Sequence, residues 1–170
     1  DWSSDVCSSD LVVMGVTPYP DLAQHVQASA AKAGVTLELE QMAPAQVFTR
    51  ARARAYQMML INWGVRYPDA HNMVSRHVMN PDNRREANLA QYPAWRAAWQ
   101  DTAMNELGQK AMMERDPEKR KALYREIQLK TMQEGPMAYM FQVVRSTAIR
   151  SEVKGFEMSA FKVGYETASK

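Results

Sequence analysis

The sequence has little of several features that mark specialised proteins. It contains one cysteine, Cys7, among 170 residues, which excludes an internal disulfide and a cysteine-based zinc cluster. Its seven glycines are scattered, and none form the GxGxxG or GxxxxGK spacing of a phosphate-binding loop. No uncharged run is apolar enough to cross a bilayer, so we expect a chain that does not span a membrane.

Neither sign of charge dominates the sequence. It has 21 lysines and arginines against 19 aspartates and glutamates, and no block of basic residues. Nucleic-acid-binding proteins usually present a much denser cationic surface, so we expect no nucleic-acid partner. With 46% hydrophobic residues, the composition is that of a globular protein and not of a disordered tail.

The first ten residues, DWSSDVCSSD, differ from the rest of the chain. They lack the basic start and apolar centre of a signal peptide. The sequencing-adapter DNA GACTGGAGTTCAGACGTGTGCTCTTCCGAT encodes them in order. We therefore expect residues 1–10 to be a non-native, adapter-derived tail, with a natural Ser/Asp-rich tail as the alternative. Without the tail, the chain begins near Leu11, lacks cysteine, and has 21 basic against 16 acidic residues, a net charge of +5.

Strands and helices are predicted to alternate in the first half of the native part. Apolar runs at 11–16 and 56–63, and an alternating segment at 35–40, predict strands. A helix is predicted over 20–33 with Gly34 as its stop, and Pro44 suits the first turn of a second helix. This order is typical of a parallel sheet with crossover helices, so the predicted fold class is α/β.

The second half is predicted to be mainly helical. Helical character extends over 93–115, with a break near Asp101. A further helix begins after the capping aspartate of Asp116-Pro117 and ends at Gly135-Pro136. The apolar segment 137–144 predicts a last strand, and weakly patterned segments follow it.

Candidate catalytic residues are missing from the sequence. No serine lies in a nucleophile elbow, and most carboxylates stand beside lysines or arginines on amphipathic helices, which is typical of a solvated surface. We interpret the arginine face of the helix that begins at Pro44 as solvated too, namely Arg50, Arg52 and Arg54. We expect no enzyme activity, no catalytic residues and no cofactor.

Two histidines raise the question of a metal site. His71 and His77 are six positions apart, with Asp69 and Met73 nearby. This spacing matches neither a helical pair of ligands nor a known zinc pattern. We expect no metal-ligating residues, and a loop that gathers these side chains around nickel or copper is the alternative.

Aromatic and polar residues are densest in the segment 63–72, WGVRYPDAHN, which is predicted to be a loop. It follows a predicted strand, and parallel sheets bind ligands just beyond the carboxyl ends of their strands. A hinge or turn in which Pro68 and Asp69 simply shape the chain is the alternative. We predict the following ligand-binding residues: Trp63, Arg66, Tyr67, Asp69 and Asn72.

Four segments together resemble the family-5 extracellular solute-binding proteins, the dipeptide, oligopeptide and nickel receptors of ABC transporters. They cover Leu11 to Phe156 in the expected order. YQMMLINWGVRYPDAHN resembles the W-G-x-D-Y-x-D-P signature, and RDPEKRKALYREIQ resembles the late helix of that family. LAQHVQASAAKAGVTLELEQM resembles a helix and strand, and GPMAYMFQ with VKGF resembles the closing strands.

The resemblance implies part of a two-lobed periplasmic-binding-protein fold. Residues 11–136 would belong to the C-terminal lobe, and residues 137–170 would cross the hinge and return toward the N-terminal lobe. The implied function is the substrate-binding component of an ABC importer. It captures a peptide-like or other small polar solute, an anionic one included, and delivers it to permease subunits. A nickel or metallophore receptor of the same fold is the alternative. The implied location is the periplasm, with a signal peptide in a missing N-terminal part.

Two positions depart from the family pattern. In peptide-binding members the acidic residue three positions after the tryptophan commonly holds the α-amino group of the peptide, and here that position is Arg66. A guanidinium repels an ammonium and prefers a carboxylate or phosphate. A peptide with a free amine is therefore not the expected ligand, unless Arg66 points to solvent. Ala70 replaces the family's proline, which loosens the turn.

Overall fold

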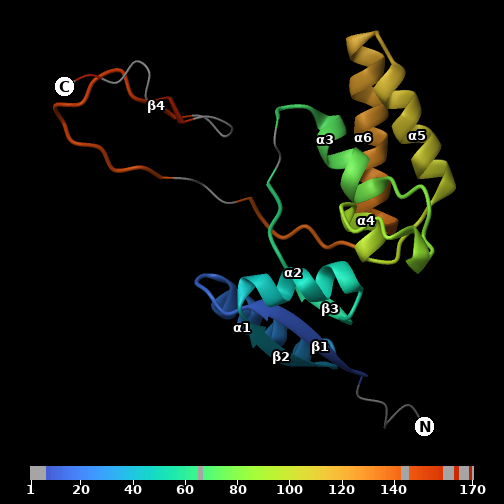
Figure 1. Ribbon diagram of the computed structural model, residues 1–170, viewed down its shortest axis with the longest axis vertical. Coiled ribbons are helices and arrows are strands. Elements are labelled where there is room, and N and C mark those ends of the chain that lie inside the picture. The colour runs from blue at the N-terminus through green and yellow to red at the C-terminus, as the bar shows by residue number, and fades with distance from the viewer. Residues whose placement is uncertain (1–6, 65–66, 143–145, 159–162, 165–168, 170) are drawn as a thin grey trace. The chain divides into compact units, whose positions relative to one another are not determined.

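The computed structural model describes residues 7–64, 67–142, 146–158, 163–164 and 169 (Figure 1). These residues form two compact units. Unit 1 consists of the residues up to Gly64 together with Asn80–Gln100. Unit 2 consists of residues 65–79 together with those from Asp101 onward. The chain therefore passes from one unit to the other three times.

Unit 1 is built around a parallel sheet. Its elements are β1 (Cys7–Met14), α1 (Tyr19–Lys32), β2 (Val35–Met42), α2 (Pro44–Ala53), β3 (Met58–Leu60), the 3₁₀ helix η2 (Arg85–Ala87) and α4 (Pro93–Arg96). The strand order is β2-β1-β3, and Leu11 of β1 lies opposite Leu39 of β2 and Met58 of β3. The predicted α/β class and parallel sheet are confirmed. Gly34, with φ 80°, ends the first helix as predicted.

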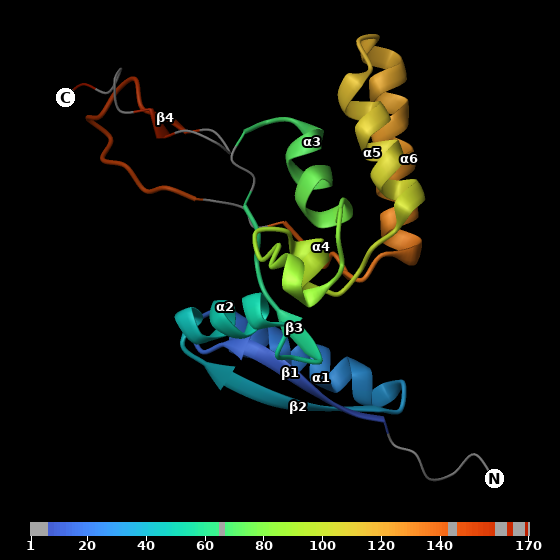
Figure 2. The same cartoon turned by 45° about the vertical axis from the view of Figure 1, so that its right-hand side comes forward.

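Strand β1 is buried on both of its faces. Successive side chains of a strand point to opposite sides, and here both sides are apolar. One face packs against α1 and the other against α2, on opposite sides of the sheet (Figure 2). The two clusters are Leu11 and Val13 with Ala23 and Leu37, and Val12 and Met14 with Val47.

The limits of two strands differ from those predicted. β1 begins at Cys7 and not at Leu11, so it includes Cys7–Asp10 of the predicted tail. Cys7 lies opposite Val35 in a ladder made by backbone groups, which any residue other than proline supplies. The pairing is therefore independent of where these residues come from, and the adapter origin stays a prediction. β3 has three residues, fewer than the predicted segment 56–63.

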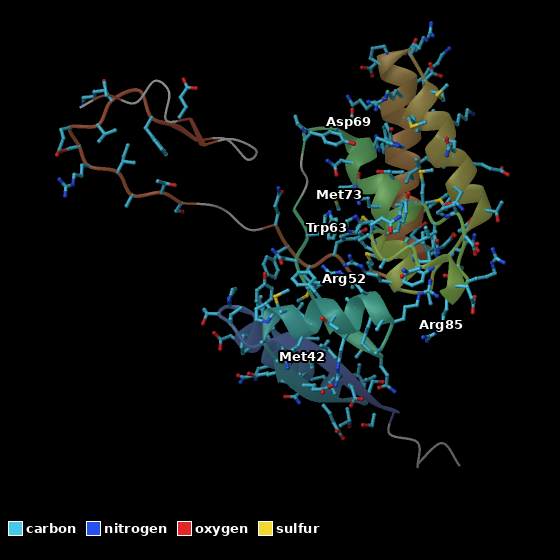
Figure 3. The ribbon with its side chains drawn as sticks, viewed as in Figure 1. Met42, Arg52, Trp63, Asp69, Met73 and Arg85 are labelled. Carbon is cyan, nitrogen blue, oxygen red and sulfur yellow. The ribbon has the colours of Figure 1, made fainter. Side chains whose placement is uncertain are left out.

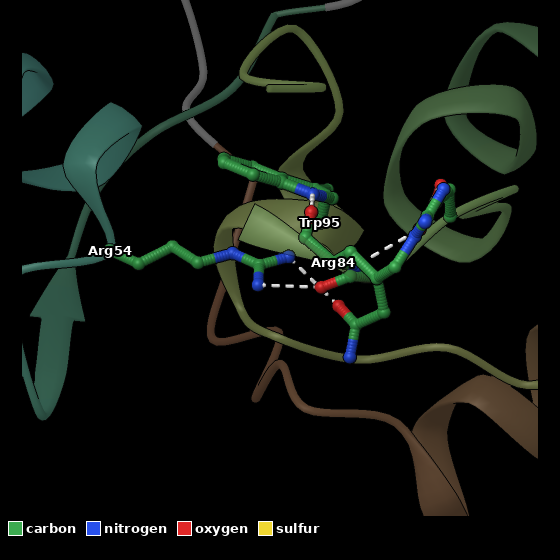
Figure 4. A network of polar contacts seen from close by, with 5 residues as sticks. Arg54, Arg84 and Trp95 are labelled. Atoms are coloured by element: carbon green, nitrogen blue, oxygen red, sulfur yellow. Dashed lines mark hydrogen bonds and ion pairs between the residues drawn. The ribbon is translucent and has the colours of Figure 1, made fainter. Parts of the chain in front are cut away.

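A polar network holds the segment Asn80–Gln100 at the end of α2 (Figure 4). The Arg54 guanidinium donates to the backbone oxygen of Asn83 at 2.9 Å and to its Oδ1 at 2.8 Å. Its central carbon lies 3.8 Å from the centre of the Trp95 ring. Trp95 Nε1 in turn donates to the backbone oxygen of Arg84 at 3.0 Å. One guanidinium therefore joins a helix end to a buried aromatic ring and a loop.

Asn80 and Asn83 extend this network inside the returning segment. The Asn80 side chain is fully buried, and its Nδ2 donates to Asn83 Oδ1 at 3.1 Å and to the Trp99 backbone oxygen at 2.8 Å. Asn83 Nδ2 donates to the backbone oxygen of Ala98 at 2.9 Å. Both amides thus satisfy backbone groups of the segment that they belong to.

The prediction of a solvated arginine face on α2 was wrong for two of its three residues. Arg50 pairs with the Glu40 carboxylate of β2, and its Nη2 lies 2.6 Å from Glu40 Oε1. Arg54 takes part in the network described above. Arg52 is exposed as predicted, with its guanidinium carbon 5.9 Å from the centre of the Phe48 ring. The prediction failed because the partners lie ten and twenty-nine positions away in the sequence.

Unit 2 is mainly helical. Its elements are α3 (Ala70–Met73), the π-helix η1 (Val74–Val78), α5 (Thr102–Met113), α6 (Pro117–Glu134), β4 (Glu157–Met158) and β5 (Val163–Gly164). The predicted break near Asp101 is confirmed, and Asp101 caps α5 by accepting the Met104 N–H at 3.0 Å. Asp116 caps α6 in the same way, as predicted. None of the described helices is long and apolar enough to cross a membrane.

The predicted strand at 137–144 was wrong for the residues that the structure describes. Residues 137–142 have no strand partner, and residues 143–144 lie outside the described part. The apolar pattern predicted a strand, but a strand also needs a neighbour for its backbone groups. Tyr139, Met140 and Phe141 are all at least half exposed.

Helices α5 and α6 form a hairpin and lie side by side in both views (Figure 1, Figure 2). Gly108 of α5 faces η1, where a Cβ atom would lie 2.8 Å from Met79 Sδ and 3.3 Å from Val74 Cγ1. Glycine is disfavoured in a helix, but at this position it allows close packing. The buried stripes are Met104, Gly108 and Ala111 on α5, and Tyr124, Ile127 and Thr131 on α6.

We predict that Gly108→Val destabilises the protein by about 1–3 kcal/mol, because the added side chain overpacks this contact. The free energy of unfolding from urea titrations followed by circular dichroism measures the effect. Gly64→Val is the control, since a Cβ atom at Gly64 meets nothing within 4 Å. Equal stability of the two variants would contradict the packing described here.

We also predict that Arg54→Lys destabilises the protein by about 1–3 kcal/mol. Lysine keeps the charge but lacks the planar fork that binds Asn83 and stacks on Trp95. In the same urea titration, Arg52→Lys on the exposed side of α2 should change stability by less than about 0.5 kcal/mol. A loss of the same size in both variants would show that only the helical position matters.

Candidate functional site

The predicted ligand-binding residues are divided between the two units. Trp63 follows β3 in unit 1 and is 36% exposed, whereas Asp69 belongs to unit 2 (Figure 3). Tyr67 and Asn72 belong to unit 2 as well. The structure brings these three together around the start of α3. Arg66 lies outside the described residues.

Asp69 begins helix α3 and ties it to α6. Its Oδ1 accepts the His71 N–H at 2.7 Å, and its two carboxylate oxygens lie 3.0 and 3.1 Å from Nη2 of Arg120. The hydrogen bond from Arg120, followed by that from the His71 backbone, holds the pKa of Asp69 below its ordinary value. Its carboxylate is therefore ionised and already bound to a cation at neutral pH.

The prediction of a loop through residue 72 was wrong from Ala70 onward, where α3 begins. An aspartate that caps the first turn is a helix-start signal, and Asp69 provides it. Val74 and Val78, four positions apart, are both buried and supply the matching helical period. The proline and glycine earlier in the segment led to the prediction of a loop, although these two signals favour a helix.

Arg120 also contacts an aromatic ring on its own helix. Its guanidinium carbon lies 4.8 Å from the centre of the Tyr124 ring, and its Nη2 lies 3.3 Å from Tyr124 Oη. The His71 ring meets Tyr124 edge-on at 6.3 Å between centres. Burial lowers the pKa of His71, so its imidazole is neutral at pH 7. This cluster supports the start of α3 by charge and by ring packing.

Asn72 and Tyr67 differ strongly in their exposure to solvent. Asn72 is buried, and its Nδ2 lies 3.4 Å from the backbone oxygen of Tyr67. Tyr67 is half exposed. Asn72 thus fixes the turn that presents the Tyr67 ring. The ligand-binding roles of both residues stay predictions.

A second group of polar residues lies around Trp63 in unit 1, and the sequence interpretation missed it. The Arg96 guanidinium carbon lies 5.9 Å from the centre of the Trp63 ring, and Arg96 Nε donates to the Ala90 backbone oxygen at 2.6 Å. The Tyr56 hydroxyl donates to the backbone oxygen of Arg96 at 2.9 Å. Burial raises the pKa of Tyr56 and lowers that of Arg96. No local spacing links these residues, so only the fold reveals the group.

His71 and His77 lie in unit 2, where His77 is buried within η1 and His71 packs on Tyr124. Among the residues that the structure describes, no group of three or more His, Cys, Asp or Glu side chains could hold a metal ion.

Comparisons with known proteins give one curated relative and several similar folds. No family model matches the chain. Over 138 residues, it is 27% identical to the di/tripeptide-binding protein 2 of Pseudomonas aeruginosa (strain UCBPP-PA14), a match that covers 81% of this chain and 25% of that protein. The dipeptide-binding protein of Pseudoalteromonas sp. SM9913, solved with Met-Leu, is 20% identical with a TM-score of 0.74, covering 96% of this chain and 32% of that one.

These similarities support the resemblance to the family-5 extracellular solute-binding proteins. The fold of the chain is part of a periplasmic-binding-protein fold. NikA from Brucella suis, solved with Fe(III)-EDTA, is also similar, with 20% identity, a TM-score of 0.56, and coverage of 75% of this chain and 24% of that one. These family-5 relatives are binding proteins of transporters and not enzymes. The chain spans about a quarter to a third of their length.

We predict that Asp69→Ala destabilises the protein more than Asp69→Asn. Asparagine keeps a capping oxygen and loses only the partly exposed pair with Arg120, at about 0.2–1 kcal/mol, whereas alanine also loses the cap, at about 1 kcal/mol more. Because the folded pKa of Asp69 is lowered, the contribution of its charge is complete above the unfolded pKa and is lost as the pH falls through the folded one.

Urea titrations at neutral pH and below about pH 4 measure both effects. The difference between the wild type and Asp69→Asn should shrink in acid. Asp116→Asn, another capping aspartate but one without an arginine partner among the described residues, is the matched control. A difference that stays constant with pH would contradict the role of the Arg120 pair.

Proposed function

We propose that this chain is a segment of the substrate-binding component of an ABC importer. The observation that supports this most directly is the agreement of sequence and fold. The same chain matches a di/tripeptide-binding protein in sequence over 138 residues. In fold, 96% of this chain matches a dipeptide-binding protein. In the complete receptor, this segment and the rest of the protein together bind a small solute. The receptor then delivers the solute to permease subunits in the membrane.

Within that receptor, residues 11–136 belong to the C-terminal lobe, and residues 137–170 cross the hinge toward the N-terminal lobe. The receptor is periplasmic and carries its signal peptide in its N-terminal part. Ligand binding moves the equilibrium between open and closed lobes because the ligand contacts both. Residues 137–142 have no assigned helix or strand, and residues 138–142 are exposed, which supports a crossing segment.

The preferred solute is peptide-like or otherwise small and polar, and it lacks a free amine or is anionic. Trp63, Arg66, Tyr67, Asp69 and Asn72 are the proposed contact residues. Arg66 occupies the position at which peptide-binding members commonly have an acid, and a cation there repels an ammonium. Asp69 offers little compensation, since its carboxylate is bound to Arg120 within unit 2.

A second candidate function is a nickel or metallophore receptor of the same fold. The similarity to the NikA fold favours it, and His71 and His77 are the residues that it would use. Both histidines belong to unit 2, where one is buried and the other packs on Tyr124.

Isothermal titration calorimetry on the complete receptor that carries this segment tests the proposal. We expect N-acetyl-Met-Leu to bind about tenfold more tightly than Met-Leu, because acetylation removes the ammonium that Arg66 repels. Arg66→Asp should reverse this order, and Arg66→Ala should reduce the difference. Tight binding of Met-Leu that is unchanged by Arg66→Ala would contradict the proposed ligand class. Binding of nickel chloride that His71→Ala abolishes would favour the second candidate.

A further inference from the structure

Three of the six arginines in unit 1 have their charge balanced by a carboxylate or their donors bound. Arg50 pairs with Glu40, Arg84 pairs with Asp82, and Arg54 is held by Asn83 and Trp95. Arg52, Arg85 and Arg96 differ. Among the residues that the structure describes, none of these three forms an ion pair with a carboxylate, and only Arg96 is partly buried.

Arg96 is held in place by contacts that leave most of its guanidinium donors uncommitted. Its Nε donates to the Ala90 backbone oxygen at 2.6 Å, and its own backbone oxygen accepts the Tyr56 hydroxyl at 2.9 Å. The preceding residue, Trp95, is buried and stacked under Arg54. The side chain is therefore preorganised, while neither Nη atom has a hydrogen-bond acceptor among the described residues.

The surroundings of Arg96 favour an anionic partner. Arg96 is half-buried beside the Trp63 ring, and the loss of water is the main cause of its lowered pKa. The second cause is the charge of Arg52, which is near enough to repel it. A cation that is both partly desolvated and repelled by another cation costs free energy, and a bound anion offsets that cost.

The Trp63 ring limits the kind of anion. It is exposed by about a third and lies beside the guanidinium, so it offers an apolar face next to the charge. A carboxylate that carries an apolar group fits both surfaces: its two oxygens match the planar guanidinium fork, and its side chain can pack on the indole. A free inorganic anion would contact only the guanidinium charge and would leave the indole face without a contact.

We propose that Arg96, with Arg52 and the Trp63 ring, recognises a carboxylate group of the solute. This proposal rests on the proposed receptor function and names the group that the receptor selects. Arg96 makes the direct contact, and Arg52 adds a longer-range attraction from the exposed side of α2 (Figure 3).

Calorimetry with two probes on the complete receptor tests it: N-acetyl-Met-Leu, which ends in a carboxylate, and its C-terminal amide, which has no charge. We expect the acid to bind at least about tenfold more tightly than the amide. Arg96→Gln should weaken binding of the acid about tenfold to hundredfold and leave binding of the amide unchanged. Arg52→Gln should have a smaller effect, about twofold to tenfold.

The controls separate recognition from folding. Arg96→Lys keeps the charge without the fork and should give an intermediate loss for the acid only. Arg115→Gln, which is exposed on unit 2, should change neither affinity. Equal weakening of both probes by Arg96→Gln would show that Arg96 acts on the fold, and it would overturn this inference while the receptor function stands. Binding of neither probe to the wild type would contradict the proposed function itself.

Discussion

Burial of β1 on both faces is the constraint on which the first unit depends. A strand with one apolar face needs one covering layer, but Val12 and Val13 are adjacent, point to opposite sides, and are both fully buried. Burial of each such side chain contributes about 1.5–3 kcal/mol only if a helix covers it. The alternation of strand and crossover helix supplies these two layers, one with α1 and one with α2.

The position of the proposed carboxylate-binding site around Arg96 follows from the layer that α2 forms on β1. The helix α2 packs on β1 through Val47, and Arg54, which follows its last residue as the C-cap, binds the returning segment. Arg54 fixes Trp95, and Trp95 fixes the next residue, Arg96. The cation beside Trp63 is thus placed by a series of contacts that begins in the core of the sheet. A change that loosens Arg54 would disturb the site without touching it.

Local signals in the sequence predict the regular elements well. The helix over 20–33, the strand at 35–40 and the capped helix that begins at Asp116 agree with the structure to within about two residues, because caps, glycine stops and apolar periods act over short distances. Prediction fails where the structure of a residue depends on a partner that is distant in the sequence. Residues 137–142 have a strand composition but no ladder partner, and Arg54 meets its partners twenty-nine positions later. The Arg96 group was missed for the same reason, whereas Trp63 and Asp69 could be selected from their local motif.

The return of Asn80–Gln100 to unit 1 also sets an order of events during synthesis. The sheet and its two helices are complete on the ribosome by residue 60, but Asn83, Trp95 and Trp99 are still to come. At about 5–20 residues per second, Trp99 follows Arg54 by roughly 2–9 s, which is long compared with the time in which helices form. In a nascent chain of this protein, the Arg54 guanidinium at the end of α2 is therefore bound only by water for seconds, until its partners are made.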